Sequence, residues 1–351
     1  MTLCRPEARP LRPLPLRERP CVKTRIGMTY DLRSDYLALG YSEEDVAEFD
    51  ADVTIQALED TIRGLGYEPV RIGNVKALCA QLVAGKRWDL VFNFAEGMGG
   101  RSREAQVPSL LEIYDIPYTF SDPLVCAVTL DKAVAKRIVY ASGLHTPRFH
   151  VVRSEQECRH VDLPYPLFAK PIAEGTGKGI DKASRLESPE QLREVCASLL
   201  RRHSQPVLVE EYLPGREFTV GILGTGAEAR VLGTMEVVIR PHAETSIYSF
   251  EIKEKCDDFV DYRRPARSPD IAAVEKLALE SYKALELRDT GRVDIRMDRD
   301  GQPAFMEVNP LPGLNPGHSD LPMIAAQEGM PYAGLIGAIL SSALRRIPAS
   351  T

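Results

Sequence analysis

The sequence has few of the features that mark secreted, membrane-bound or zinc-binding proteins. Its seven cysteines are odd in number, scattered and without a CxxC pair, and its six histidines form no HExxH motif. A disulfide framework and a zinc site are therefore excluded, and the cysteine usage is typical of a reducing cytosol. No apolar run approaches the length of a membrane span, and the first residues lack the apolar segment of a signal peptide. We expect a cytoplasmic protein with no membrane partner.

The sequence also has fewer basic residues than acidic ones. The 351 residues include 44 lysines and arginines against 50 aspartates and glutamates. The resulting net charge of −6 argues against a non-specific nucleic-acid binder. The apolar and charged fractions, 44% and 27%, are those of a soluble globular protein. A chain of this length is expected to form more than one core or subdomain.

The N-terminal tail and the segment after it differ in composition. Residues 1–21 hold five prolines among five arginines, so we expect a disordered or extended tail, with a PxxP ligand as the alternative. The following pattern predicts a strand over 22–29, a loop from Tyr30 to Tyr41 and a helix from about Asp45. Strands and helices go on alternating, and the run DLVFNF reads as a buried strand. This pattern predicts a parallel sheet covered by helices.

The most informative stretch runs from Arg292 to Gly313 and begins as a β-hairpin. Two short strands flank Asp300-Gly301, a dipeptide that favours a two-residue turn with positive φ. Polar and apolar residues alternate along both strands, so one face is apolar and the other carries charged side chains. A stiff, proline-containing turn follows directly, which is unusual for the end of an ordinary hairpin.

Pairing the strands outward from this turn brings two carboxylates together. Asp294 faces Glu307, and Arg292 faces Asn309 on the same side. Two opposed carboxylates repel each other unless a cation binds between them. Two carboxylates and an amide oxygen form an oxygen-only ligand set that suits Mg²⁺. We therefore predict an Mg²⁺ site, in which Mn²⁺ can substitute, at Asp294, Glu307 and Asn309; a solvated acidic hairpin is the alternative.

A second motif follows a strand that ends at Lys170. Residues 170–179 read KPIAEGTGKG, so three glycines fall within five residues and leave the backbone free to approach a ligand closely. Successive N–H groups of such a loop can hold phosphate oxygens. The spacing excludes a Walker A loop, and a plain turn is the alternative reading.

Residues 306–330, MEVNPLPGLNPGHSDLPMIAAQEGM, resemble the C-terminal signature of the D-alanine–D-alanine ligases of the ATP-grasp superfamily. The likeness extends over roughly residues 22–345. It implies an α/β chain with the ATP-grasp fold, in which three α/β subdomains hold the nucleotide between the central and C-terminal ones. The expected parts are a tail, an N-terminal subdomain, a central subdomain, and a C-terminal subdomain with the metal and acceptor site: 1–21, 22–127, 128–212 and 213–351.

The resemblance also implies the residues of the nucleotide site. The positions that match the family's ATP-binding residues are Lys132, Lys170, Glu174, Gly175, Thr176, Gly177, Glu210, Leu213, Glu217 and Lys253. The three lysines would face the phosphates. Glu210 and the backbone near Leu213 would receive the adenine amine, and Glu217 would bind the ribose hydroxyls. Thr176 stands where the ligases carry a loop serine.

The second-substrate site is implied in the same way. Arg292 and Ser319 match the residues that hold the carboxylate of the amine-donating substrate, and Gly313 matches the glycine whose N–H supports the oxyanion together with Arg292. These residues and Thr176 form the expected catalytic set. Aligning Ser319 requires one inserted residue, which leaves His318 as the alternative at that place.

The first-substrate pocket departs from the family. Glu96-Gly97 replaces the ligases' histidine-glycine, and Glu254 replaces the tyrosine after the third phosphate lysine. Residues 28–35, MTYDLRSD, have no clear equivalent of the acidic residue that grips the first D-alanine. Either Glu96 binds the ammonium group instead, or the first substrate differs from D-alanine; an exposed loop glutamate is the third reading.

We predict an ATP-dependent carboxylate–amine ligase of the D-alanine–D-alanine ligase type, which forms an amide through an acyl phosphate and releases ADP and phosphate. Its partners would be small amino-acid or peptide substrates, not nucleic acid, and a homodimer is left open. One alternative is an ATP-grasp ligase that joins another amino acid or peptide in specialised metabolism. The other is a non-catalytic nucleotide-binding relative, against which the intact Asp294, Glu307 and Asn309 count.

Overall fold

The computed structural model describes residues 23–240 and 259–347. The tail predicted for residues 1–21 lies outside this part of the chain, and so do Lys253 and Glu254. No helix within the described ranges is long and apolar enough to cross a membrane. The cysteines described there are free thiols: Cys79, Cys126, Cys158 and Cys196.

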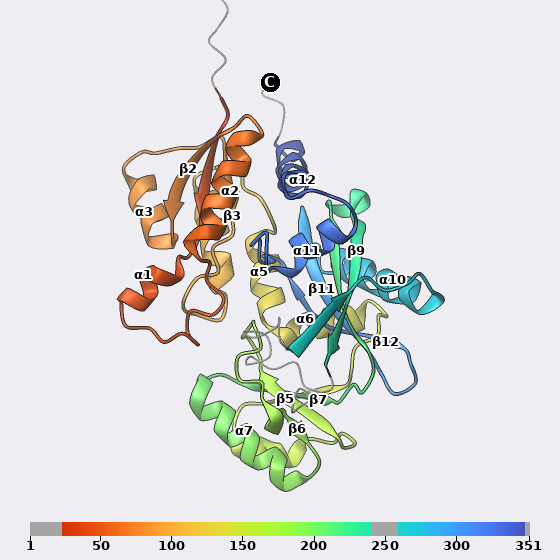
Figure 1. Ribbon diagram of the computed structural model, residues 1–351. Helices are drawn as coiled ribbons and strands as arrows, with labels where there is room; N and C mark the ends of the chain where they lie inside the picture. Colours follow the sequence, from red (N-terminus) through yellow and green to blue (C-terminus); the bar gives the residue numbers. More distant parts are fainter. Residues whose placement is uncertain (1–22, 241–258, 348–351) are drawn as a thin grey trace, which may run out of the picture.

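The first sheet is parallel, with the strand order β2-β1-β3. Its strands are β1 (Arg25–Thr29), β2 (Glu68–Gly73) and β3 (Leu90–Asn93). The helices in this part are α1 (Arg33–Ala38), α2 (Asp52–Gly64), α3 (Val75–Val83) and α4 (Gln106–Ile113) (Figure 1). Ile55, Leu58 and Ile62 of α2 repeat at helical spacing and are buried. The parallel, helix-covered sheet predicted from the alternating pattern is confirmed.

The segment between β1 and α2 differs from the sequence prediction. The loop expected from Tyr30 to Tyr41 contains α1, and α2 begins at Asp52 instead of near Asp45. The Oδ2 atom of Asp45 accepts hydrogen bonds from the N–H and the hydroxyl of Ser42, at 2.9 and 2.7 Å. Such local bonds offer the backbone an alternative to a helix. Residues 42–51 therefore form turns that reach the central cavity described below.

The second sheet is antiparallel, with the order β4-β7-β5-β6. Its strands are β4 (Phe149–Val152), β5 (Leu167–Pro171), β6 (Arg185–Leu186) and β7 (Val207–Glu211). Helix α7 (Pro189–His203) covers it (Figure 1). The helix begins where the sequence predicted, because the Ser188 hydroxyl accepts the N–H of Gln191 and Pro189 occupies the first turn.

The third sheet has the order β10-β9-β8-β11-β12 and is antiparallel throughout. Its strands are β8 (Glu217–Leu223), β9 (Arg230–Ile239), β10 (Val260–Arg263), β11 (Thr290–Met297) and β12 (Pro303–Asn309). The helices near it are α5 (Pro123–Leu130), α6 (Lys132–Ala141), α10 (Pro269–Ala284), α11 (Asp320–Gln327) and α12 (Tyr332–Arg345). Helices α5, α6 and α10 share one core with β8, β11 and β12. Helix α6 therefore presents its first residues to the end of the predicted metal hairpin.

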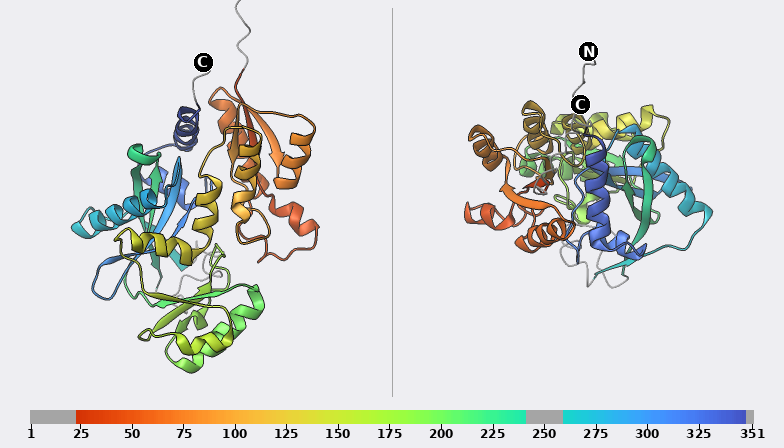
Figure 2. Two further views of the ribbon diagram at one scale, coloured as in Figure 1. Left: turned by 180° about the vertical axis from the view of Figure 1, so that it is seen from behind. Right: turned by 90° about the horizontal axis from the view of Figure 1, so that it is seen from above.

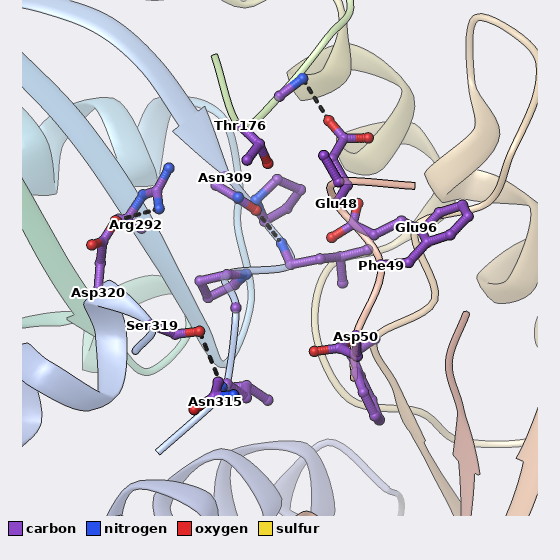
Figure 3. Close-up of a pocket in the computed structure, with 18 of the residues that line it drawn as sticks. Glu48, Phe49, Asp50, Glu96, Thr176, Arg292, Asn309, Asn315, Ser319 and Asp320 are labelled. Carbon is purple, nitrogen blue, oxygen red and sulfur yellow. Dashed lines mark hydrogen bonds and ion pairs between the residues drawn. The ribbon is translucent and has the colours of Figure 1, made fainter. Parts of the chain in front are cut away.

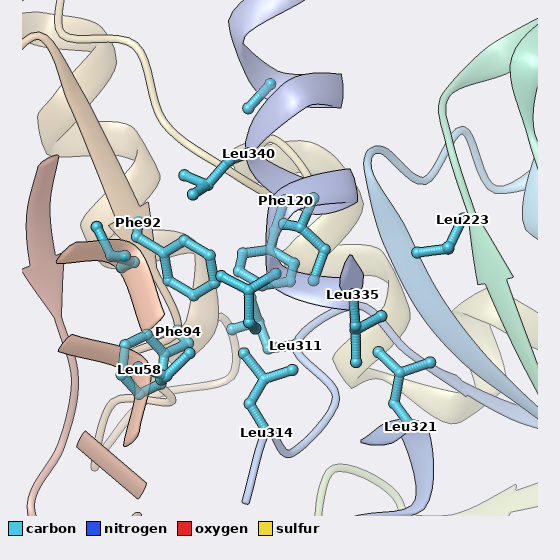
Figure 4. Close-up of a cluster of buried hydrophobic side chains, with 14 of the residues drawn as sticks. Leu58, Phe92, Phe94, Phe120, Leu223, Leu311, Leu314, Leu321, Leu335 and Leu340 are labelled. Carbon is cyan, nitrogen blue, oxygen red and sulfur yellow. The ribbon is translucent and has the colours of Figure 1, made fainter. Parts of the chain in front are cut away.

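A single hydrophobic core joins the first sheet to the C-terminal helices. Phe92 of β3 and Leu335 and Leu340 of α12 are buried in it (Figure 4). Seen from above, α12 runs between the first sheet and the third (Figure 2). Leu311 and Leu314, from the loop after β12, belong to the same core. Each fully buried side chain of this size contributes roughly 1.5–3 kcal/mol, so this core holds the loop in place beside the cavity.

Candidate active site

A cavity of about 380 Å³ lies where the parts of the molecule meet. It is lined by the turn segment 47–51, by the glycine loop 174–176 and by residues 307–315 at the end of β12 and after it (Figure 3). These segments are far apart in sequence. The first precedes α2, the second follows β5, and the third begins at the end of β12. The volume falls within the range of about 300–1,000 Å³ that is typical of small-molecule sites.

The hairpin of β11 and β12 forms one wall of this cavity and has the predicted pairing. Asp294 is opposite Glu307, and Arg292 is opposite Asn309. The register shifts by one residue at a bulge immediately after Asp294.

The turn of the hairpin is where the prediction is wrong. It spans Asp298 to Gln302, and the Asp298 carboxylate accepts the N–H groups of Asp300 and Gln302, each at 2.8 Å. This turn is longer than the predicted two-residue turn, but the bulge compensates by one residue. The pairing at the site therefore agrees with the prediction, although the turn does not.

Each of the opposed carboxylates has cationic neighbours. An oxygen of Glu307 lies 3.6 Å from the Nζ atom of Lys132 and 3.7 Å from that of Lys170. The Oδ2 atom of Asp294 accepts a hydrogen bond from Arg292 Nη2 at 3.2 Å. These contacts offset the repulsion between the two carboxylates.

The donor set at this wall fits Mg²⁺. It offers only oxygen atoms, from Asp294, Glu307 and the amide of Asn309, whose Oδ1 also accepts the N–H of Leu311 at 2.9 Å. Within residues 23–240 and 259–347, no group of three or more histidine, cysteine, aspartate or glutamate side chains is arranged to hold a metal. Mg²⁺ does not need such a group, because it is commonly bound through one or two carboxylates, substrate phosphates and water.

A narrower space of about 60 Å³ adjoins the wall, between β5 and the third sheet. It brings together several of the residues that the resemblance assigns to ATP: Lys132, Lys170, Glu174, Gly177 and Glu217. Gly175 and Thr176 line the larger cavity instead. A space of this size is far below the roughly 300 Å³ of a typical small-molecule site. Lys132, Glu174, Arg292 and Glu307 line both spaces, so the narrower one is continuous with the residues of the larger cavity.

Glu210, assigned to adenine by the resemblance, lies between two buried lysines. Its carboxylate contacts Lys170 at 3.0 Å and Lys136 at 2.9 Å. Burial lowers the pKa of Lys136 to about 8. The sequence analysis did not single out Lys136, yet it follows Lys132 by four residues on one helix, a spacing that places both on the same face.

The residues expected to bind the second substrate lie at one end of the larger cavity. Arg292 Nη1 donates to Asp320 at 2.6 Å, and the Ser319 hydroxyl accepts the N–H of Asn315 at 3.0 Å. A Cβ atom on Gly313 would lie 2.7 Å from Ser319 Oγ, so glycine permits this close approach. His318 also lines the cavity, next to Ser319 in the chain.

The opposite end of the cavity carries acidic side chains, most of which the sequence analysis missed. Glu96 lines it as expected, together with Glu48, Asp50 and Glu104. Figure 3 shows Glu48 and Glu96 across the cavity from Arg292. The sequence analysis missed Glu48 and Asp50 because it predicted a helix from about Asp45, whereas α2 begins at Asp52. Both residues lie in the connection between β1 and α2. The sequence analysis had found no equivalent of the family's first-substrate acidic residue at the start of this connection, in residues 28–35.

Burial changes the proton affinity of these carboxyls. It raises the pKa of Glu104 to about 7, and burial together with the nearby charge of Asp31 raises that of Asp50 to about 7. Burial and the charges of Glu104 and Glu48 raise the pKa of Glu96 well above its usual range. At neutral pH these groups therefore hold fewer negative charges than the same residues would in water.

Replacing Glu104 by glutamine is expected to stabilise the ligand-free protein at pH 8. A carboxyl with a raised folded-state pKa binds its proton more tightly in the folded state. Burying the ionised Glu104 carboxylate destabilises the folded protein. This destabilisation is absent below about pH 4.5, the pKa in the unfolded chain, and is complete above about pH 7, the pKa in the folded protein. The free energy of unfolding should rise by about 1–3 kcal/mol at pH 8 and hardly change at pH 4.5. Thermal unfolding at both pH values measures this difference.

The matched control is Glu112→Gln on α4, an exposed glutamate whose amide can still accept the hydrogen bond from Tyr118. Its effect should be small and similar at both pH values. Equal melting temperatures for Glu104→Gln and the unchanged protein at pH 8 would contradict the prediction.

Comparison with known proteins identifies the family of the chain. The sequence model of the family "D-ala D-ala ligase C-terminus" matches residues 138–341. The chain is 33% identical to the D-alanine–D-alanine ligase of Bordetella petrii over 94% of this chain and 96% of that protein. It is 35% identical to the uncharacterised protein y4sG of Sinorhizobium fredii over 73% and 75% of the two chains.

Solved structures show the same fold. The D-alanine–D-alanine ligase of Bacillus anthracis superposes with a TM-score of 0.71 at 23% identity, covering 92% of this chain and 98% of that one. Its complex with ATP superposes with a TM-score of 0.68 at 24% identity. The chain therefore belongs to the D-alanine–D-alanine ligase family and is an ATP-dependent ligase, forming C–N bonds, with the ATP-grasp fold.

Proposed function

We propose that the protein joins two amino-acid or peptide substrates in the larger cavity, with one carboxylate activated by ATP. The observation that carries the proposal is the gathering of Arg292, Glu307, Asn309, Gly313 and the glycine loop around one space of about 380 Å³. These groups come from separate segments and match, by type and order, what a phosphorylated carboxylate and an attacking amine require.

In the first step, a carboxylate oxygen of the first substrate bonds to the γ-phosphorus of ATP while the bond from phosphorus to ADP breaks. Lys132 and Lys170, beside Glu307, supply positive charge where phosphate oxygens would lie. The N–H groups of the glycine loop can donate hydrogen bonds to the same oxygens. Asp294, Glu307 and Asn309 would hold Mg²⁺, which would neutralise phosphate charge.

In the second step, the amine nitrogen of the second substrate bonds to the acyl carbon, and phosphate leaves. The amine gives up a proton, so that a neutral amide forms. Arg292 and the N–H of Gly313 lie together at the wall where negative charge on the acyl oxygen would develop. Ser319, beside Gly313, is placed to bind the carboxylate of the second substrate.

The acidic end of the cavity is the proposed first-substrate site. Glu96 and its acidic neighbours suit a substrate ammonium group, whereas the family's histidine is missing there. We place the enzyme in the cytoplasm, where ATP is supplied and the free thiols stay reduced. A homodimer is compatible with the proposal, and measuring the mass of the protein in solution tests it.

ADP release with single and paired D- and L-amino acids, with the product identified by mass spectrometry, tests this function. We expect release that depends on amino acids, and D-alanine alone should be a poor pair of substrates. Efficient synthesis of D-alanyl-D-alanine that is unaffected by Glu96→Gln would contradict the proposed first-substrate site. ATP hydrolysis without any amide product would contradict the proposed reaction.

A further inference from the structure

The acidic end of the cavity has more carboxylates than close cationic partners. Four carboxylates line it: Glu48, Asp50, Glu96 and Glu104. Arg103 contacts Glu48, and Arg33 lies near Asp50. Two lysines act on the group at longer range, Lys132 on Glu104 and Lys178 on Glu48, but they form their ion pairs with other carboxylates.

Both carboxylate oxygens of Glu48 already accept hydrogen bonds from the protein. Its Oε2 atom accepts from Arg103 Nη2 at 2.8 Å, and its Oε1 atom accepts the N–H of Gly175 at 2.5 Å. Arg103 is also engaged, because its Nη1 atom donates to the carbonyl of Ala173 at 2.9 Å. This pair connects the turn segment to the glycine loop, and Arg103 acts on Glu104 and Glu96 through its charge without an ion-pair contact.

Glu104 has one buried oxygen without a hydrogen-bond partner. Its side chain lines the cavity, the residue is 7% exposed, and its Oε2 atom accepts no hydrogen bond. Within the described residues, neither Glu104 nor Glu96 forms an ion pair at contact distance. A buried carboxylate without a partner is costly, and such groups usually mark a place where a ligand binds.

The backbone holds Glu96 and Glu104 close to each other. Gly97 has a φ of +74°, and a Cβ atom there would lie 2.8 Å from the carbonyl oxygen of Arg103. Glycine at this position therefore lets the loop that carries Glu96 lie against the turn that carries Glu104. The two carboxylates are brought together by the fold in spite of their repulsion, as in a site for a cation.

From this arrangement we propose that the first substrate is a basic amino acid, whose side chain carries an ammonium or guanidinium group. Its α-ammonium and its side-chain cation would pair with Glu96 and Glu104, which form no ion pair within the described residues. A bound cation would also favour the ionised form of both carboxyls. A neutral amino acid brings one cation and leaves one carboxylate unpaired. The proposal rests on the proposed function, since it concerns the substrate of the same cavity.

The test compares substrates of equal size that differ in charge. ADP release and amide formation are measured with D- and L-lysine, ornithine and arginine, each paired with D-alanine and other acceptors. Norleucine replaces the lysine ammonium by a methyl group and is the neutral reference. We expect kcat/KM for the best basic first substrate to exceed that for norleucine at least tenfold. Mass spectrometry must show the basic residue as the donor of the carboxyl group.

Glu104→Gln should lower this ratio of basic to neutral substrates at least tenfold, because the amide removes the charge but keeps the shape. Glu112→Gln, exposed and outside the cavity, should leave the ratio unchanged. The comparison of lysine with norleucine in the unchanged protein decides the question even if the Glu104 variant fails to fold.

Equal use of norleucine and lysine would overturn the inference and leave the ligase function intact. A basic residue found only as the amine donor would overturn it too. If no pair of amino acids gives ADP and an amide, the proposed function itself fails, and the inference fails with it.

Discussion

Replacing Glu307 by glutamine is expected to abolish amide formation while the protein stays folded. Glu307 faces Asp294 across the hairpin and lies within 3.7 Å of both Lys132 and Lys170. The amide would remove a charged ligand of the proposed metal site and the carboxylate that lies beside two lysines proposed to face phosphate. Loss of several kcal/mol of charge stabilisation corresponds to a fall in kcat of about 10³-fold or more. ADP release under saturating ATP, Mg²⁺ and amino acids measures it.

Glu236→Gln is the matched control. Glu236 lies on β9 of the same sheet and pairs with Arg216, away from both cavities. This variant should keep activity near that of the unchanged protein. The melting temperature of Glu307→Gln without nucleotide should stay within a few degrees, because one charge is removed from a cluster that already holds both signs. Wild-type turnover by Glu307→Gln with Mg²⁺ would refute the assignment of Glu307.

The parts of the molecule that could be predicted from the sequence are those whose patterns are local. The pairing of Asp294 with Glu307 followed from strand alternation and an approximate turn position. The start of α7 followed from Ser188 and Pro189. The order of strands in the three sheets was not predicted, since single-sequence patterns do not fix which strands become neighbours.

The acidic end of the cavity could not be predicted because it depends on tertiary contacts. Glu48 reaches the glycine loop only because residues 42–51 form turns, and those turns depend on local bonds such as that of Ser42 with Asp45. Glu104 sits in a segment that reads as an ordinary helix start. Its significance comes from burial and from the missing partner of Oε2, neither of which a sequence records.

Arg292→Lys is expected to raise KM for the second substrate and to lower kcat at the same time. The guanidinium donates to Asp320 at 2.6 Å and to Asp294 at 3.2 Å, so it is held in one orientation at the cavity that Gly313 also lines. Lysine keeps the charge but cannot donate through a planar fork. Removal of one oxyanion donor typically costs about 10²–10³-fold in kcat, and weaker binding of the carboxylate adds to this in kcat/KM.

Arg216→Lys is the matched control, because Arg216 also pairs with a carboxylate beside the third sheet but lies outside both cavities. Steady-state kinetics with the second substrate varied and ATP saturating separate the two effects. A rise in KM alone would limit Arg292 to carboxylate binding, and a fall in kcat alone would limit it to the transition state. Unchanged values of both would remove Arg292 from the mechanism, and the wall formed by Gly313 and Ser319 would then have to bind the second substrate without it.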